Sequence, residues 1–546
     1  MLIGGQAGDG IKQAGNAIAR LYNRLGYWVF VYEDYPSLIR GGHNFAIIRS
    51  APTPIQGHKD KIDVLLALNQ DTIEKQKWRL QPHSLIVFDS SVVKAEGLGI
   101  PMGEIVKAKG LPPIVRNTAA LAALAAALGV DFAVVEEVVR SATKRKIEEN
   151  LAVAEEAYGQ AAASGRRFEV PLLDNPPKPL LAGSEAIALG AVRAGMKLYI
   201  AYPMTPSSPV LHYLAARQEE LGIVTVHPEN EIAVVGMAQG AAYAGVRAMV
   251  GTSGGGFALM TEHVSLAGQA EIPTVVLLGQ RPGPSTGMPT YTDQGDLFFA
   301  MYAGHGEFPR IVLAPGDAEE CFRLAGEALN LAWKYQTPVI LLADKEVLES
   351  TFSTVLDHDA VRAEEPILWD GNGDYRRYAH TDSGISPLAY PGNPSAIVKL
   401  NSYEHDESGI TTEESTEVVA MRDKRLRKCA AVEADLRQRN TVAVYGNPDS
   451  DTVLVFYGST KGPVVEVAGA LGVKAVQPLY LMPLPVWDLA PHLNKAKEVI
   501  SVEVNITGRL ALWLDYNGLR VDESIVKYDG RPFAVDELEQ RVKEVL

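Results

Sequence analysis

The feature that most constrains the fold is a regular alternation of short apolar strands with helical stretches between residues 183 and about 350. Strand-like runs such as KLYIAYP, VTVHP, RAMVGTS and PTVVLLGQ are separated by segments with helical periodicity, for example SPVLHYLAARQEELG. Strands that alternate with helices in this way are typical of crossover units, which build a parallel sheet covered by helices on both faces. The sequence therefore predicts a doubly wound α/β domain.

The same alternation occurs on both sides of that domain. A short strand, a glycine-rich turn and a helical stretch open the chain in MLIGGQAGDGIKQAGNAIARLYNRLG, and apolar runs follow at 28–32, 64–68 and 84–89. We expect a parallel sheet with crossover helices there, and a third such unit in the tail. The predicted organisation is an α/β domain over 1–168, an extended linker over 169–182, the doubly wound domain over 183–350, an irregular connecting segment over 351–440 and a third α/β domain over 441–546.

The charge balance of the chain restricts its partners. Asp and Glu number 66 and Lys and Arg number 51, which gives a net charge of −15 and disfavours binding to nucleic acid. The basic stretch from Lys424 to Lys428 is interpreted as a solvated helix face before a linker. No apolar run approaches the ~20 residues that span a bilayer, and no secretory signal pattern is visible, so we expect a cytoplasmic protein without a membrane partner.

The two cysteines, Cys321 and Cys429, are far apart and belong to no C-x-x-C pair. An iron–sulfur cluster needs about four thiolates, and a structural zinc site needs three or four soft ligands. We therefore expect this chain alone to hold no metal. Cys321 lies in a helical pattern, DAEECFRLAGEALNLAW, in which a buried free thiol is expected.

The string AYPMTPSSPV, residues 201–210, follows a predicted strand and precedes a predicted helix. Ligands of doubly wound sheets bind beyond the carboxyl ends of the strands, where the N–H groups of helix N-termini attract anions. Thr205 offers a hydroxyl at this place, and Ser207 or Ser208 can cap the helix. The alternative is that these residues only form a turn and a cap.

Two glutamates, Glu229 and Glu231, open the next helical stretch, ENEIAVVGMAQGAAYAG. The later face of this stretch is almost entirely small or apolar, so either carboxylate is a candidate for a partly buried acid. The alternative is that both glutamates only stabilise the positive end of the helix dipole.

Another apolar strand delivers Arg281 into the loop RPGPSTGMPTYTDQGD. The guanidinium is permanently charged and matches a carboxylate bidentately, so it is a candidate for binding an anionic substrate, with an internal ion pair as the alternative. The string TSGGGFALMTE, residues 252–262, places a glycine nest between a strand and a helix, a geometry that suits close approach of an anion or cofactor.

Taken together, these strings resemble the 2-oxoacid:ferredoxin oxidoreductases in the form that fuses the γ and α parts. GGQAGDGI and YPSLIRGGHN resemble the γ part, and GSEAIALGAVRAG, YPMTPSS, TSGGGFALMTE and QRPGPSTGMPT resemble the α part. FYGSTKGP and EVNITGRL in the tail resemble a transketolase-C-like domain. The resemblance implies three α/β domains, one of which binds the pyrimidine side of thiamine diphosphate.

The resemblance also implies roles for single residues. Glu231 would hydrogen-bond the aminopyrimidine ring of thiamine diphosphate, which promotes removal of a proton from its thiazolium ring. Thr205 and Arg281 would hold the 2-oxoacid, with Arg281 on its carboxylate, and Thr290 would be another hydroxyl facing the substrate. Further contacts to the cofactor are implied at Tyr202, Pro203, Ser253 and Gly254.

Because the chain lacks cluster cysteines and a diphosphate-binding motif, the resemblance implies a partner. A β subunit would supply Mg²⁺, the diphosphate site and a [4Fe–4S] cluster, in a hetero-oligomer such as a dimer of αβ units. Coenzyme A would accept the acyl group and ferredoxin the electrons, in the oxidative decarboxylation of a 2-oxoacid to acyl-CoA and CO₂. The fused form favours 2-oxoglutarate as the substrate.

Three alternatives stay open at this stage. The substrate could be pyruvate or a branched-chain 2-oxoacid, since both share the carboxylate. An indolepyruvate-type enzyme is disfavoured because its large subunit carries a cysteine-rich cluster domain that this tail lacks. A catalytically silent assembly subunit is disfavoured by the joint presence of Glu231, Thr205 and Arg281.

Overall fold

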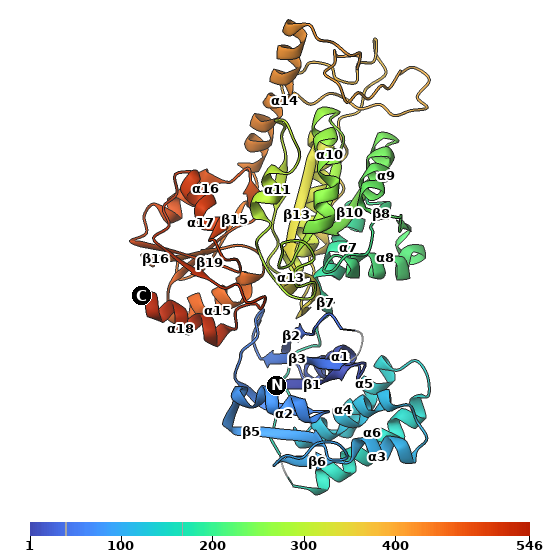
Figure 1. The fold of residues 1–546 in the computed structure, drawn as a ribbon, viewed down its shortest axis with the longest axis vertical. Helices are drawn as coiled ribbons and strands as arrows, with labels where there is room; N and C mark the ends of the chain where they lie inside the picture. The colour runs from blue at the N-terminus through green and yellow to red at the C-terminus, as the bar shows by residue number, and fades with distance from the viewer. Residues whose placement is uncertain (39–40, 166) are drawn as a thin grey trace.

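The computed structural model describes residues 1–38, 41–165 and 167–546, whose strands form three β-sheets (Figure 1). Ile39 and Arg40 of the YPSLIRGGHN motif, and Arg166 at the end of the first predicted domain, lie outside the described residues. In Figure 1 the first sheet and its helices lie at the bottom, the second in the centre and the third on the left. The prediction of a multidomain α/β protein with three sheets is confirmed.

The first sheet is mixed, whereas a parallel sheet was expected. Its β1, β4, β5 and β6 strands pair in parallel, but the other neighbours pair antiparallel. The reason is the short connection between β2 and β3, which is too short for a crossover helix and therefore makes a hairpin. The strand order is β6 (Leu98–Ile100), β5 (Leu80–Asp89), β4 (Ile62–Ala67), β1 (Leu2–Ala7), β3 (Gly41–Ala51), β2 (Trp28–Asp34), β14 (Thr351–Ser353) and β7 (Leu180–Ala182).

Six α-helices accompany this sheet in the described residues of the N-terminal part. α1 packs on β2 and β3, while α4 packs mainly against α6. Their bounds are α1 (Ile11–Arg24), α2 (Gln70–Gln76), α3 (Met102–Ala108), α4 (Arg116–Ala127), α5 (Phe132–Ala142) and α6 (Ile147–Ala163).

The second sheet is parallel except for one edge strand, as the alternation of strands and helices predicted. Every residue of its central strands β11 and β13 is buried, which explains their continuous apolar runs TVVLLGQ and PVILLAD. The strand order is β18 (Tyr480–Met482), β12 (Ile311–Leu313), β13 (Pro338–Asp344), β11 (Thr274–Gln280), β10 (Ala248–Ser253), β8 (Leu198–Ile200) and β9 (Val224–Val226). Its helices are α7 (Gly183–Arg193), α8 (Ser208–Leu221), α9 (Glu231–Tyr243), α10 (Gly254–Gln269), α11 (Leu297–Tyr302), α12 (Ala318–Tyr335) and α13 (Lys345–Glu349).

The third sheet is parallel apart from its first strand, β15, which runs antiparallel to β17. Its strand order is β15 (Val442–Gly446), β17 (Lys474–Pro478), β16 (Thr452–Phe456), β19 (Glu498–Glu503) and β20 (Glu523–Val526). The helices of this unit are α15 (Lys461–Leu471), α16 (Val486–Leu493), α17 (Arg509–Tyr516) and α18 (Val535–Val545).

Three short strands join a sheet other than the one expected from their position in the sequence. β7 ends the stretch expected to be a linker, and β14 opens the stretch expected to be irregular, yet both complete the first sheet. β18, from the tail, pairs antiparallel with β12 of the second sheet. Backbone hydrogen bonds therefore connect the parts of the chain, in addition to the connecting segments.

The segment expected to be irregular also contains a long helix, α14 (Ser415–Leu436). Together with the loops that precede it, this helix forms an extension at the top of Figure 1, here called the arm (residues 366–436). The prediction of irregular structure is therefore wrong for α14 and β14, while the loops of the arm have no regular structure apart from isolated bridges.

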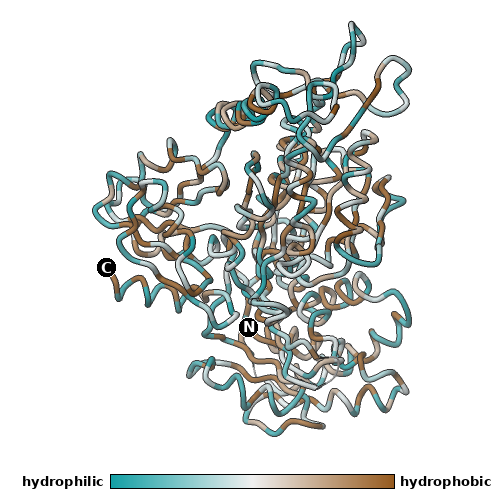
Figure 2. The backbone as a smooth tube through the Cα atoms, turned by 45° about the horizontal axis from the view of Figure 1, so that its top comes forward, coloured by the Kyte–Doolittle hydropathy of each residue, from teal (hydrophilic) through white to brown (hydrophobic). Residues whose placement is uncertain are grey.

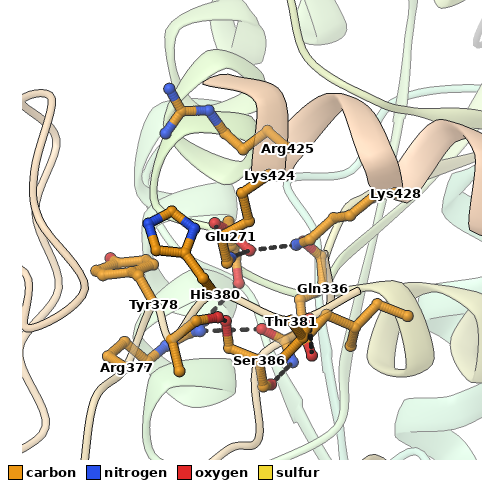
Figure 3. A network of polar contacts seen from close by, with 12 residues as sticks. Glu271, Gln336, Arg377, Tyr378, His380, Thr381, Ser386, Lys424, Arg425 and Lys428 are labelled. Carbon is orange, nitrogen blue, oxygen red and sulfur yellow. Dashed lines mark hydrogen bonds and ion pairs between the residues drawn. The ribbon is translucent and has the colours of Figure 1, made fainter. Parts of the chain in front are cut away.

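The interpretation of Lys424 to Lys428 as a solvated face is also wrong. Lys424 and Lys428 are completely buried, and both contact the carboxylate of Glu271, the second residue after α10 (Figure 3). Lys424 Nζ lies 2.7 and 2.8 Å from the two carboxylate oxygens, and Arg377 donates to the Glu271 carbonyl oxygen at 2.6 Å. This Glu271 cluster attaches the arm to the second sheet and its helices.

The burial pattern follows the hydropathy of the sequence. Figure 2 shows hydrophobic stretches alternating with hydrophilic ones along the chain, as expected for strands and helices with one or both faces covered. Among the helices that the structure describes, none is both long enough and apolar enough to cross a bilayer.

Candidate active site

The candidate site lies at the carboxyl edge of the second sheet. β8, β10 and β11 are adjacent and parallel, so the segments that leave their carboxyl ends meet on the same side. These segments contain the AYPMTPSSPV string, the glycine nest at the start of α10, and Arg281. The sheet thus assembles three motifs that the sequence separates.

Glu231 is the first residue of α9 and is only 4% exposed. The helix begins here because the side chain of Asn230 accepts a hydrogen bond from the Ala233 amide at 3.0 Å. Glu231 Oε1 is buried and has no hydrogen-bond partner among the described residues. Glu229, the other candidate acid, is exposed.

The Glu231 carboxylate packs against the first turn of α10. A Cβ atom at Gly256 would lie only 2.6 Å from Glu231 Oε1 and would also clash with the hydroxyl of Thr252. Glycine at this position is therefore required for the close approach of α10 to the carboxylate. Thr252 and Gly256 belong to the glycine nest, but no sequence pattern indicates that they contact Glu231.

Arg281 and Thr205 are in direct contact. Arg281 Nη1 donates a hydrogen bond to the Thr205 carbonyl oxygen at 2.6 Å, which fixes the guanidinium over the AYPMTPSSPV loop. Burial lowers the pKa of Arg281, and the nearby carboxylate of Asp296 opposes this shift. In the described part of the chain Arg281 forms no salt bridge, so the alternative of an internal ion pair is not what the structure shows.

Ser253 and Gly254 lie at the junction of β10 and α10. The Ser253 side chain is buried, and its hydroxyl has no partner within the described residues. A Cβ atom at Gly254 would lie 2.8 Å from Asp296 Oδ2, so this carboxylate covers the N-terminus of α10. The positive end of the helix dipole favours a negative charge at that position.

The remaining residues predicted for the site, Tyr202, Pro203 and Thr290, differ in their exposure and contacts. Tyr202 is partly exposed and packs edge-to-face on His227, with ring centroids 5.7 Å apart. Pro203, beside it, is exposed. Thr290 is buried, and its hydroxyl donates to the Tyr35 carbonyl oxygen at 2.7 Å, which links the loop after β11 to the first sheet.

Two carboxylates in the loop after Arg281 were missed by the sequence argument. Burial raises the pKa of Asp296 to about 6, although Arg509 and Arg281 act in the opposite direction. Burial also raises the pKa of Asp293 to about 6. Carboxylates with a pKa close to neutrality are frequent at functional sites, but nothing in a loop sequence indicates which of its acids will be buried.

The arrangement fits the pyrimidine half of thiamine diphosphate. A buried carboxylate oxygen without a partner needs a donor, and the N–H of an aminopyrimidine ring supplies one. The Ser253 hydroxyl, which also has no partner among the described residues, is a second polar group available to such a ligand. In the described residues no group of three or more His, Cys, Asp or Glu side chains could hold a metal ion.

Comparisons with known families agree with this geometry. Residues 189–424 match the family described as pyruvate flavodoxin/ferredoxin oxidoreductase, thiamine diphosphate-binding. Residues 1–160 match the family described as pyruvate ferredoxin/flavodoxin oxidoreductase.

Individual relatives match over the whole chain. The 2-oxoacid:ferredoxin oxidoreductase 2 alpha subunit of Aeropyrum pernix is 33% identical over 100% of this chain and 97% of the relative. The corresponding alpha subunit of Saccharolobus solfataricus is 30% identical, with the same coverage of both chains.

A solved structure is also similar in fold. The 2-oxoglutarate:ferredoxin oxidoreductase of Magnetococcus marinus, with 2-oxoglutarate, coenzyme A and succinyl-CoA bound, has a TM-score of 0.91 and 32% identity. The match covers 100% of this chain and 98% of that one. The resemblance predicted from the motifs is thereby confirmed: the chain belongs to the family of 2-oxoacid:ferredoxin oxidoreductase alpha subunits.

Proposed function

We propose that this chain provides the pyrimidine side of the active site in a coenzyme-A-dependent oxidoreductase that decarboxylates 2-oxoglutarate. The observation that carries the proposal is the buried Glu231 oxygen, which has no hydrogen-bond partner in the described part of the chain and lies at the carboxyl edge of a parallel sheet. When bound, thiamine diphosphate supplies the carbon nucleophile that attacks the keto group. Glu231 Oε1 would share a proton with a ring nitrogen of the cofactor, a positioned transfer that contributes roughly 10²- to 10⁴-fold to the rate.

Arg281 is proposed to bind the substrate carboxylate. Its guanidinium is half-buried, oriented by the Thr205 carbonyl oxygen, and without a salt bridge among the residues described. A carboxylate is the partner that such a group lacks. Thr205 is proposed to contact the substrate beside it, and Tyr202, Pro203, Ser253 and Gly254 to line the cofactor. Thr290 is retained as a substrate contact, although its hydroxyl donates to Tyr35 in this structure.

The preference for 2-oxoglutarate is supported by the ligands named for the Magnetococcus marinus enzyme, which include 2-oxoglutarate and coenzyme A. A Mycobacterium tuberculosis relative named 2-oxoglutarate oxidoreductase subunit KorA is 28% identical over 99% of this chain. Pyruvate and branched-chain 2-oxoacids are the alternatives, since Arg281 would bind their carboxylates equally well.

A β subunit is proposed to complete the site. The name alpha subunit in the relatives implies other subunits, and apolar side chains are exposed on the helices that flank Glu231, namely Ile232 and Met237 on α9 and Leu259 on α10. Large exposed apolar side chains close to a site are typical of a surface that a partner covers. We propose that the β subunit brings Mg²⁺, a [4Fe–4S] cluster and contacts for ferredoxin, in a dimer of αβ units located in the cytoplasm.

The test is an assay of the chain co-purified with its β subunit, with viologen reduction by a panel of 2-oxoacids measured with and without coenzyme A. We expect coenzyme-A-dependent reduction, with the highest kcat/KM for 2-oxoglutarate. Arg281→Gln is expected to raise the KM by about 10- to 100-fold, because it removes a charge-assisted hydrogen bond.

Arg217→Gln is the matched control, since Arg217 is an exposed arginine that stacks on Tyr213 of α8. It is expected to leave the KM unchanged. Absence of viologen reduction with every 2-oxoacid would overturn the proposal, and an unchanged KM in Arg281→Gln would remove Arg281 from the substrate site.

A further inference from the structure

A cavity of about 620 Å³ lies where the end of α14 meets the third sheet's helices and the loop before β12. Its lining includes Phe308 and Arg310 from that loop, Cys429 from α14, Trp487 from α16 and Trp513 from α17. None of these residues belongs to the candidate active site. A volume of this size is sufficient for a small organic ligand.

Arg310 is the unusual member of this lining because it is a buried cation that forms no salt bridge with any of the described residues. The residue is 7% exposed, and its guanidinium stacks on Phe308, 4.4 Å from the ring centroid. The one acceptor for the guanidinium in the described residues is the Ala303 carbonyl oxygen, 2.5 Å from Nη1. Burial lowers the pKa of Arg310 to about 10, and only the phenol of Tyr302 opposes this shift.

A guanidinium carries five N–H donors, and burial makes unpaired donors costly. The buried carboxylate of Glu271, by contrast, is compensated by two lysines. Apart from the bond to Ala303, the guanidinium of Arg310 has no acceptor among the described residues, and its other nitrogens are not among the fully buried polar atoms, so a ligand can reach them. A carboxylate matches its planar fork best.

The remaining walls define the body of the ligand. Trp487, Trp513, Phe308 and neighbouring aliphatic side chains make the lining predominantly apolar. Trp513 Nε1 donates to the Leu481 carbonyl oxygen at 2.8 Å, whereas the buried Trp487 Nε1 has no acceptor among the residues described. The lining thus combines aromatic walls with the guanidinium of Arg310.

The charge at the rim does not compensate Arg310. Glu433 and Arg437, which also line the cavity, form an ion pair with each other at 2.6 Å. Arg437 additionally covers one face of Trp487, 4.3 Å from the ring centroid. The rim is neutral as a whole, so the net charge of the lining is the positive charge of Arg310.

We propose that this cavity is a binding site for a small organic monocarboxylate with an aromatic or branched apolar body. The carboxylate pairs with Arg310, and the body lies between the two tryptophans. The site is separate from the one that holds the substrate, and its ligand bridges α14 of the arm and the helices of the third sheet.

The test uses the full chain in its complex, with 4-phenylbutyrate as the probe and the uncharged 4-phenylbutyramide as its matched control. Binding is measured by calorimetry and by quenching of tryptophan fluorescence. We expect the acid to bind with a dissociation constant of about 1 mM or tighter, and the amide to bind roughly ten- to a hundred-fold more weakly. Arg310→Gln is expected to reduce the affinity for the acid to that for the amide, while Arg437→Gln, at the rim, keeps the preference for the acid.

Alkylation of Cys429 gives a second measurement that needs no variant. Cys429 is exposed and lines the cavity, whereas the other cysteine, Cys321, is fully buried, so a thiol reagent reports on Cys429. The acid is expected to protect Cys429 more strongly than the amide does. Equal binding or equal protection by acid and amide, or no binding of either, would overturn the proposal.

Discussion

Two buried glutamates in the central part of the chain, Glu231 and Glu271, differ in whether their carboxylates are paired with cations. They are exposed to 4% and 1%, respectively. Both carboxylate oxygens of Glu271 contact lysines of α14 (Figure 3), whereas Glu231 Oε1 has no partner among the described residues. Buried charges in proteins are almost always paired, so the unpaired one indicates a site and the paired one a structural attachment.

Their positions relative to neighbouring helices explain part of this difference. Glu231 is the first residue of α9, where the helix dipole and free N–H groups stabilise a negative charge. Glu271 follows the C-terminus of α10, where the dipole disfavours a negative charge. Glu271 therefore depends on Lys424, Lys428 and Arg377, and the coulombic effect of these cations holds the pKa of its carboxyl well below the usual range despite burial.

The largest expected effect comes from removing the unpaired carboxylate. Glu231→Gln is expected to lower turnover of the complex by about 10²- to 10⁴-fold, because an amide cannot take up the proton. The folding stability of the Glu231→Gln variant is expected to equal or exceed that of the original chain, because the substitution removes a buried charge that has no partner among the described residues. The measurements are viologen reduction and thermal unfolding of the same preparation.

Unchanged turnover in Glu231→Gln would favour a silent assembly subunit. Glu229→Gln is the matched control, because Glu229 is exposed two residues earlier, and it is expected to keep turnover within a factor of two or so of the original.

The reverse result is expected for the paired carboxylate. Glu271→Gln leaves two buried lysines without an anion. The free energy of local unfolding of the arm should therefore fall by about 3–5 kcal/mol. Hydrogen exchange over α14 measures this local opening. Turnover per folded molecule is expected to be unaffected, and protection of α14 equal to that of the original chain would contradict the structural role.

Glu404→Gln provides a graded comparison within the arm. Glu404 accepts two hydrogen bonds from Arg425 at 2.9 and 2.6 Å, but its side chain is 18% exposed. Glu404→Gln is expected to lower the free energy of local unfolding of the arm by less than Glu271→Gln does, because water can replace the lost partner at a partly exposed ion pair. Hydrogen exchange over α14 in the two variants compares these effects.

The smallest expected effect is a pH dependence caused by Lys428. Burial lowers its pKa to about 7, with Lys424 and Arg377 acting in the same direction and Glu271 against it. A folded-state pKa below the unfolded value of 10.5 means that the unfolded chain binds more protons between these two values. The stability contributed by Lys428 therefore rises with pH above 7, by at most about 1.4 kcal/mol per pH unit.

The measurement is denaturant unfolding of the original chain and of Lys428→Met at pH 7, 8 and 9. The original chain is expected to gain stability relative to the variant over this range. A constant difference between the two would show that Lys428 keeps its proton in the folded state.

The fold could be predicted where local signals are strong. Alternating apolar strands and helices gave the second sheet, and the buried runs of β11 and β13 are readable from the sequence alone. The hairpin of β2 and β3 was missed because the strand Gly41–Ala51 begins with polar residues and glycine. β7, β14 and β18 are too short to be recognised without their partners in the sheets.

The residues of the candidate site could likewise be predicted only where a local motif marks them. Motifs placed Thr205 and Arg281 after strands and Glu231 at the start of a helix, and the structure brings Thr205 and Arg281 into contact. The burial of Asp296 and its position over Gly254 depend on how a loop folds back on a helix. Likewise, Lys424 and Glu271 are 153 residues apart, so a basic stretch read by itself looked solvated.

The strands β7 and β14 have a consequence for how the polypeptide can be divided. Both complete the first sheet, and Phe352 of β14 also packs edge-to-face against Phe30 of β2 with ring centroids 5.2 Å apart. If the backbone were cut in the proline-rich stretch before β7, each fragment would retain part of one hydrogen-bonded ladder. The two fragments would then associate by β-augmentation across the cut, as separately encoded subunits do when one supplies an edge strand to the other.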